Sequence, residues 1–224
     1  MDIKAGLSRI GEELVRCPEK GCEGIKNDPS SGIVPRGLFF EERDASQVGC
    51  AVIGINPGIA DESEREIYIK EFRKNTLTYQ TTVDYWERKL TENNRYYHRL
   101  HSFVAQIGIT GSILWTELVK CENETKRKSP SLQTFRTCTR LYLKRELVIP
   151  NEWFLIAVGK KAYKVLAYLC PERTVVGVPH PTGAHGNFDE LFEGNSAKNG
   201  ALKPKCKYGI KRGQAVWLSD CLES

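Results

Sequence analysis

The sequence predicts an α/β fold, a three-layer sandwich in which helices cover both faces of a short, mainly parallel sheet. Short apolar runs of strand length recur along the chain, and segments with apolar residues at helical spacing lie between them. With 224 residues, the chain is expected to form a single domain, because one core can keep growing to roughly 250 to 300 residues. Within it we expect an N-terminal helix and cysteine loop over residues 1–36 and a basic C-terminal segment over residues 196–224.

The first elements are a helix, a strand and a second helix. Apolar residues recur at helical intervals in Ile3–Val15, and a loop with two cysteines follows. Cys50–Ile55 is a short apolar run that ends in Asn-Pro-Gly, which predicts a buried strand and a turn. Asp61–Glu66 is acidic, as the first turn of a helix tends to be.

The same alternation continues to the end of the fourth expected strand. The expected elements are strand Ile113–Val119, helix Ser131–Glu146, strand Trp153–Val158, helix Lys160–Leu169 and strand Thr174–Val178.

The composition excludes a membrane-spanning protein. A transmembrane helix needs about 20 apolar residues, whereas the longest apolar runs here have the length of strands, and the mean hydropathy is -0.42. Met1–Arg16 lacks the pattern of a secretory signal. We expect a cytoplasmic monomer with no membrane partner.

Positive charge is concentrated in two segments of the chain. Lys120–Arg145 holds eight basic and two acidic residues, and Ser196–Gly213 holds six basic residues and no acidic one. The whole chain carries only +5, so the remainder is net negative. Such clustering suits a phosphate backbone, and DNA is the expected partner. A solvated surface face is the alternative.

Polar motifs follow three of the expected strands. They are Asn56-Pro57-Gly58, Glu117 to Cys121, and His180-Pro181-Thr182-Gly183. Ligands of parallel sheets bind outside the carboxyl ends of the strands, so these motifs are the candidate site. Taken singly, Asn-Pro-Gly could be a simple turn, and a lone histidine could cap a loop.

Taken together, the motifs resemble those of the uracil-DNA glycosylase superfamily. Gly54–Gly58 (GINPG) is similar to the first motif of its mismatch-specific branch, and His180–Gly183 (HPTG) to its second motif. Leu118–Cys121 (LVKC), followed by Cys138, is similar to the cysteine segment of its iron-sulfur branch. The resemblance covers about residues 37–188.

The resemblance implies a monofunctional DNA glycosylase that flips a nucleotide out of DNA and leaves an abasic site. Asn56 would orient the water that attacks C1′ of the sugar, and His180 would donate toward O2 of the departing base. The remaining first-motif residues would contact the substrate; these are Gly54, Ile55, Pro57 and Gly58.

The resemblance also assigns residues to stacking and DNA contact. The aromatic face for the flipped base would come from Tyr68, Phe72 or Tyr79. The wedge that fills the gap in the duplex would be His185 or Phe188, with Phe188 under the loop in the core as the alternative. Further DNA contacts are expected from Lys120, Lys126, Arg127, Lys128, Thr182 and Gly183.

Glu117 departs from the family pattern. The iron-sulfur branch has Asn at this position, four residues before the cysteine, to read uracil. A carboxylate offers only acceptors unless it is protonated, and an acceptor suits the exocyclic amine of cytosine. We therefore expect a cytosine-like, 5-substituted base, such as those of some phage DNAs, with host defence as the role. A shifted strand or a structural salt bridge is the alternative.

The cysteines form two pairs around the first strands. Cys17-x4-Cys22 and Cys121-x16-Cys138 could hold a 4Fe-4S cluster or tetrahedral zinc, or remain free thiols. The resemblance favours the cluster, although the family's first pair is usually Cys-x2-Cys. Cys50, Cys170, Cys206 and Cys221 are expected to be core or surface thiols.

Two rival functions remain open. One is an ordinary uracil or mismatch repair glycosylase, and the other is a non-catalytic DNA-binding sensor of modified bases. A nucleotide-binding protein is disfavoured, because no G-x-x-x-x-G-K-[ST] or G-x-G-x-x-G motif follows a strand.

Overall fold

The computed structural model describes residues 2–92, 94–125, 128–182, 188–191 and 214–218. Its helices are α1 (Ile3–Val15), α2 (Glu62–Arg73), α3 (Tyr79–Thr91), α4 (Arg95–Gln106), α5 (Leu132–Cys138), α6 (Lys144–Glu146) and α7 (Lys160–Leu169), with a π-helical segment at Thr139–Leu143 and 3-10 turns at Pro29–Ser31 and Phe188–Leu191. Its strands are β1 (Leu38–Glu41), β2 (Cys50–Gly54), β3 (Ile113–Glu117), β4 (Phe154–Val158), β5 (Val175–Val178) and β6 (Ala215–Trp217).

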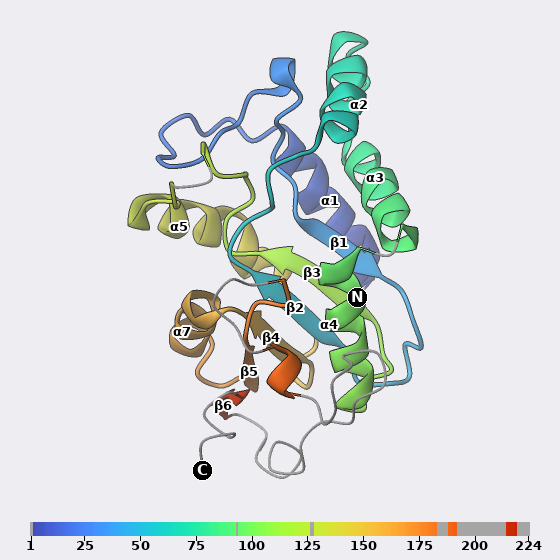
Figure 1. Cartoon of the computed structure of the whole chain (residues 1–224), viewed down its shortest axis with the longest axis vertical. Coiled ribbons are helices and arrows are strands. Elements are labelled where there is room, and N and C mark those ends of the chain that lie inside the picture. The colour runs from blue at the N-terminus through green and yellow to red at the C-terminus, as the bar shows by residue number, and fades with distance from the viewer. Residues whose placement is uncertain (1, 93, 126–127, 183–187, 192–213, 219–224) are drawn as a thin grey trace. The chain divides into compact units, whose positions relative to one another are not determined.

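The strands form one six-stranded sheet in the order β1-β3-β2-β4-β5-β6. The register pairs β2 with β4, β4 with β5, and β5 with β6, all in parallel. Helix α7 packs against β4 and β5 (Figure 1). The expected α/β class with a mainly parallel sheet is confirmed.

Local signals explain the elements that the sequence predicts. Helix α1 has the expected bounds, with the Asp2 side chain accepting from Ala5 N at its start. Helix α2 begins after Asp61, whose side chain accepts from Glu64 N. The expected helix Ser131–Glu146 is broken by its π-helical segment into α5 and α6.

Strand β3 ends at Glu117, two residues earlier than the sequence suggests. After Glu117, the backbone forms hydrogen bonds with the segments around Ile55 and Arg36. Val119 N donates to Ile55 O at 2.9 Å, and Lys120 O accepts from Arg36 N at 2.7 Å. Elements β1, α3, α4 and β6 also lie outside the expected set.

Contacts divide the chain into two compact units, each assembled from separate stretches. The first unit comprises Met1–Phe40, Ile55–Arg88 and Thr116–Ile149, and the second comprises Glu41–Gly54, Lys89–Trp115 and Pro150–Ser224. The single domain stays a prediction. Within the described residues, no helix is both long and apolar enough to cross a bilayer.

A buried ion pair lies in the core of the first unit. Lys120 Nζ is 2.7 Å from Glu146 Oε2 and 2.5 Å from Thr116 Oγ1, and both charged side chains are at most 1% exposed. Thr116 Oγ1 donates to the same Glu146 oxygen at 2.6 Å. The structure corrects the expectation that Lys120 contacts DNA, because its ammonium is enclosed and already neutralised.

Substitution of Lys120 by Met should destabilise the protein by about 3–5 kcal/mol, because it leaves the Glu146 carboxylate buried without a counter-charge. Lys120→Met combined with Glu146→Leu should recover most of that loss. Urea unfolding of both variants tests the expectation, and equal losses in the single and double variants would contradict it.

Candidate active site

The first-motif turn directly follows β2 in the sequence and belongs to the first unit. Asn56 is partly buried there, and its Nδ2 lies 3.1 Å from Asn123 Oδ1, 3.2 Å from Pro57 O and 3.4 Å from Cys121 O. All three partners are acceptors in this arrangement, so the amide nitrogen is held by the protein. The Oδ1 atom is thus the end that could accept a hydrogen bond from water.

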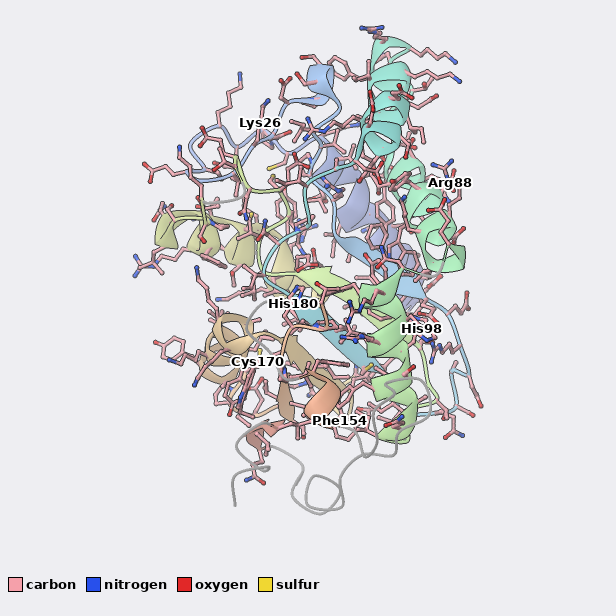
Figure 2. All side chains as sticks on the ribbon, in the orientation of Figure 1. Lys26, Arg88, His98, Phe154, Cys170 and His180 are labelled. Carbon is pink, nitrogen blue, oxygen red and sulfur yellow. The ribbon has the colours of Figure 1, made fainter. Side chains whose placement is uncertain are left out.

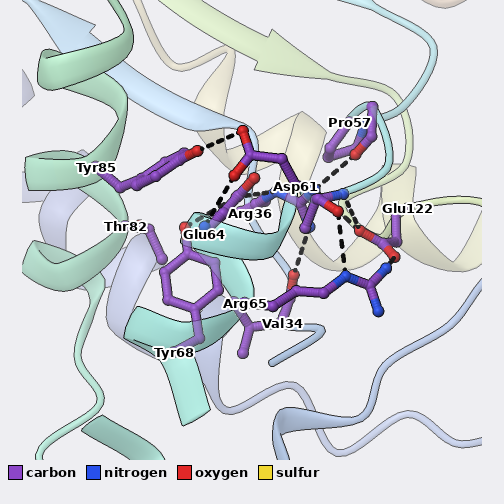
Figure 3. A network of polar contacts seen from close by, with 12 residues as sticks. Val34, Arg36, Pro57, Asp61, Glu64, Arg65, Tyr68, Thr82, Tyr85 and Glu122 are labelled. Carbon is purple, nitrogen blue, oxygen red and sulfur yellow. Dashed lines mark hydrogen bonds and ion pairs between the residues drawn. The ribbon is translucent and has the colours of Figure 1, made fainter. Parts of the chain in front are cut away.

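A buried carboxylate fixes the segment that follows this turn. Glu122 Oε2 accepts from Arg36 Nη2 at 3.0 Å and from Ala60 N at 2.8 Å, and Glu122 Oε1 accepts from Arg65 Nη2 at 2.8 Å. Arg36 also donates to Gly58 O at 2.6 Å and pairs with Glu64 at 2.8 Å. Figure 3 shows these contacts converging between the turn and α2.

Glu117 ends β3 in the same unit. Its Oε2 atom is buried and has no hydrogen-bond partner among the described residues, although part of the side chain is exposed. Gly37 lies against it: a Cβ at Gly37 would come within 2.8 Å of Glu117 Cγ and 3.2 Å of Pro57 Cγ. The φ of +86° at Gly37 also favours glycine.

The environment of Glu117 favours its neutral form. Desolvation raises the pKa of this carboxyl from 4.5 to about 8, a shift that the charges of Lys120 and Arg36 oppose and that of Glu146 supports. Near neutral pH the group is therefore mainly a carboxylic acid, which carries one O–H donor and one carbonyl acceptor.

The four cysteines of the two sequence pairs interact with one another in the first unit. Cys121 and Cys138 are buried, and Cys17 and Cys22 are partly buried. Desolvation raises the pKa of Cys121, and the charges of Cys138, Cys17 and Cys22 raise it further. Desolvation, followed by the charges of Cys138 and Cys17, raises the pKa of Cys22 to about 11.

These four thiols form no disulfide with one another. A site for a single metal ion made of three or more His, Cys, Asp or Glu side chains is not found among the described residues. Four cysteine thiols are nonetheless the donor set that a 4Fe-4S cluster uses, and the electrostatic repulsion between their thiolates is what a cationic centre would relieve.

The second-motif histidine belongs to the second unit, where it follows β5 (Figure 2). His180 Nδ1 lies 3.1 Å from Thr182 Oγ1 and 3.4 Å from Thr182 N. The backbone N–H can only donate, so Nδ1 is the acceptor and the proton resides on Nε2. Desolvation lowers the pKa of His180 and favours this neutral form. The centroid of the Tyr96 ring lies 5.4 Å from the centroid of the His180 imidazole.

The structure separates the aromatic candidates. Tyr68 is 1% exposed and its hydroxyl donates to Glu64 at 3.1 Å, so it has no face open to a base. Tyr79 is 7% exposed and donates to Leu38 O, whereas Phe72 is 44% exposed. Phe188 packs edge-on against Phe103 and is 1% exposed, which corrects its assignment as a wedge and favours the core alternative.

The remaining DNA-contact candidates are only partly described. Lys128 is exposed and bonds to Glu124 at 2.7 Å, and Thr182 is exposed next to His180. Predictions for Lys126, Arg127, Gly183 and His185 concern positions outside the described residues.

Comparison with family models gives a match to the uracil DNA glycosylase superfamily over residues 40–202. The chain belongs to this superfamily. No curated protein matches the chain. Uracil DNA glycosylase superfamily membership supports DNA glycosylase activity and DNA as the partner.

Sequence reasoning missed three residues that shape the site. Arg36 and Asn123 act through contacts with segments far along the chain, which no local pattern announces. Gly37 has a weak signal, since it stands in Pro-Arg-Gly ahead of an apolar run.

The stability of the protein should fall as pH rises from about 4.5 toward about 8, in part because of Glu117. The folded state holds the Glu117 proton over this range while the unfolded state has lost it, so raising the pH favours unfolding. Glu117→Gln should remove up to about 1.4 kcal/mol of this loss per pH unit. Urea unfolding of the wild type, Glu117→Gln and the exposed control Glu124→Gln measures it; parallel curves for wild type and Glu117→Gln would contradict the expectation.

Proposed function

We propose that the chain is a monofunctional DNA N-glycosylase that flips out a modified pyrimidine and hydrolyses its glycosidic bond to leave an abasic site. The held Asn56 amide supports this, because its Oδ1 is the atom left to orient the attacking water. A fixed tautomer at His180 adds support, because its Nε2–H can donate to O2 of the departing base.

In this proposal the rate comes mainly from electrostatic stabilisation. An asparagine is no strong base, so Asn56 positions the water rather than removing its proton. Negative charge grows on the base as the bond to C1′ lengthens, and the neutral His180 donor interacts more strongly as it grows.

We propose further that the excised base has a cytosine-like edge and a 5-substituent, as in foreign phage DNA. The observation that supports this is the carboxyl group of Glu117, whose buried Oε2 atom has no hydrogen-bond partner among the described residues. Its pKa is raised from the ordinary value of 4.5 to about 8. As an acid, Glu117 can donate to N3 of cytosine and accept from its exocyclic amine. Excision of ordinary cytosine would damage the cell's own genome, so a distinguishing modification is part of the proposal.

The neutral acid also defines the rival substrate. With the proton on its O–H directed at O4 of uracil, the same group accepts from uracil N3–H. A uracil or mismatch repair glycosylase is therefore the second candidate, and it differs from the first in the released base.

Base release from duplexes carrying uracil, mismatched thymine, cytosine or 5-substituted cytosines separates the candidates. We expect release of a 5-substituted cytosine only, and a loss of about 100-fold or more with Asn56→Ala or His180→Ala, by analogy with other transition-state donors. Glu117→Gln should keep both a donor and an acceptor, whereas Glu117→Leu should abolish base selection. Release of uracil alone would favour repair, and tight binding without release would favour a sensor.

We propose that Cys17, Cys22, Cys121 and Cys138 bind a 4Fe-4S cluster. The pKa values of Cys22, Cys121 and Cys138 are each raised in part by the charges of other cysteines of this set, which supports this. Such a cluster would be structural, since it would hold the N-terminal cysteine loop to the segment after β3 and is not needed for hydrolysis.

Protein purified without oxygen should contain iron and acid-labile sulfide in equal amounts and absorb visible light. Cys138→Ser should lower the iron content and the melting temperature, because it removes one of four cluster ligands. Cys170→Ser, outside the set, should leave the iron content unchanged. Stoichiometric zinc without sulfide, or no metal at all, would contradict the cluster.

A further inference from the structure

Asn123 lies two residues after Cys121 and makes the shortest of the contacts to the Asn56 amide nitrogen. Its Oδ1 is 3.1 Å from Asn56 Nδ2, compared with 3.2 Å for Pro57 O and 3.4 Å for Cys121 O. Asn123 is the one side-chain acceptor among these three contacts, since the other two are backbone carbonyls.

The orientation of both amides follows from the partners. The carbonyls of Pro57 and Cys121 can only accept, so the end of Asn56 that faces them is the nitrogen. Asn123 must then present its oxygen to that nitrogen. Without Asn123, the Asn56 nitrogen would keep only backbone acceptors, of which Cys121 O is distant at 3.4 Å.

Asn123 stands on a segment that is itself fixed. The neighbouring Glu122 side chain is 2% exposed and binds Arg36, Arg65 and Ala60 N. On the backbone, Asn123 forms an antiparallel bridge with Ile25, and Lys26 N donates to Glu122 O at 3.0 Å. Because the backbone of Asn123 is already fixed, its side chain can hold the Asn56 amide in one orientation with little further loss of conformational entropy.

We propose that Asn123 is a positioning residue that holds the Asn56 amide with its Oδ1 presented to the attacking water. This inference rests on the proposed role of Asn56 as the water-orienting residue. It also makes the segment Cys121–Asn123 a direct link, because Cys121 O and Asn123 Oδ1 both accept from the same amide.

The link connects the cysteine loop to Asn56. Ile25 and Lys26, a few residues after Cys22, pair with Asn123 and Glu122, and Glu124 N donates to Gly24 O at 3.1 Å. Disturbance of the loop would therefore reach Asn56 through two backbone pairings and one side-chain hydrogen bond.

The decisive experiment is a double-variant cycle on the single-turnover rate of base release. Asn123→Leu should slow release about tenfold with little change in DNA affinity, because a free Asn56 amide samples unproductive orientations. Asn123→Asp keeps an acceptor oxygen and should restore most of the rate. In the Asn56→Ala background, Asn123→Leu should cause no further loss. The control Glu124→Gln should match the wild type.

A second readout is independent of activity. In nitrogen-15 NMR spectra, the Asn56 side-chain amide, assigned by its loss in Asn56→Ala, should exchange slowly with solvent, and Asn123→Leu should accelerate that exchange. The inference would be overturned if Asn123→Leu slowed base release about tenfold in the Asn56→Ala background as well. It would also be overturned if Asn123→Leu left the solvent exchange of the Asn56 amide unchanged. An inactive wild type with slow, Asn123-dependent exchange would overturn the proposed function and leave the hydrogen bond established.

Discussion

The Glu122 carboxylate organises the first unit around the Asn56 turn. It is 2% exposed, and its oxygens bind Arg36, Arg65 and the backbone of Ala60. Burial of a carboxylate is costly unless its oxygens are fully paired, so these three segments are constrained to stay together. Arg36 extends the constraint to Gly58 O, at the end of the GINPG motif. The orientation of the neighbouring Asn56 amide depends on this frame.

Lys120 and Glu117, one basic and one acidic side chain near the end of β3, differ in whether the core provides a partner for them. Lys120 is neutralised at 2.7 Å by Glu146. At Glu117, desolvation raises the pKa of the carboxyl and outweighs the opposing charges of Lys120 and Arg36. The neutral acid at Glu117 is therefore a consequence of burial without a hydrogen-bond partner for its Oε2 atom among the described residues.

Local patterns predicted much of the fold. The bounds of α1 and α7 and the positions of β2, β4 and β5 follow from periodicity and capping residues that act within a few positions. Tertiary contacts decided the rest. Lys120 was expected to contact DNA, but an ion pair with Glu146 holds it in the core. Phe188 was a candidate wedge with a core position as the alternative, and its ring contact with Phe103 favours the core.

The sequence supplied candidate residues for the site but not the orientation of their side chains. The resemblance supplied Asn56, His180 and Glu117, whereas Asn123, Gly37 and Arg36 act across 22 to 86 positions or through backbone geometry. Side-chain spacing in a sequence carries no information about which end of an amide faces a carbonyl. That information arises only when Cys121 O and Pro57 O occupy the space next to Asn56.

In the proposed reaction, the protonation states of Glu117 and His180 favour departure of an anionic base. Cleavage of the glycosidic bond leaves negative charge on the pyrimidine, so an ionised carboxylate against the base would oppose the reaction. Desolvation favours the protonated form of Glu117 near neutral pH, and in the proposed reaction its O–H would donate more strongly as charge accumulates on the base. Desolvation likewise keeps His180 neutral, with its donor fixed on Nε2 by Thr182. Under the proposed function, recognition of the base and stabilisation of its departure would both depend on the desolvation of these two side chains.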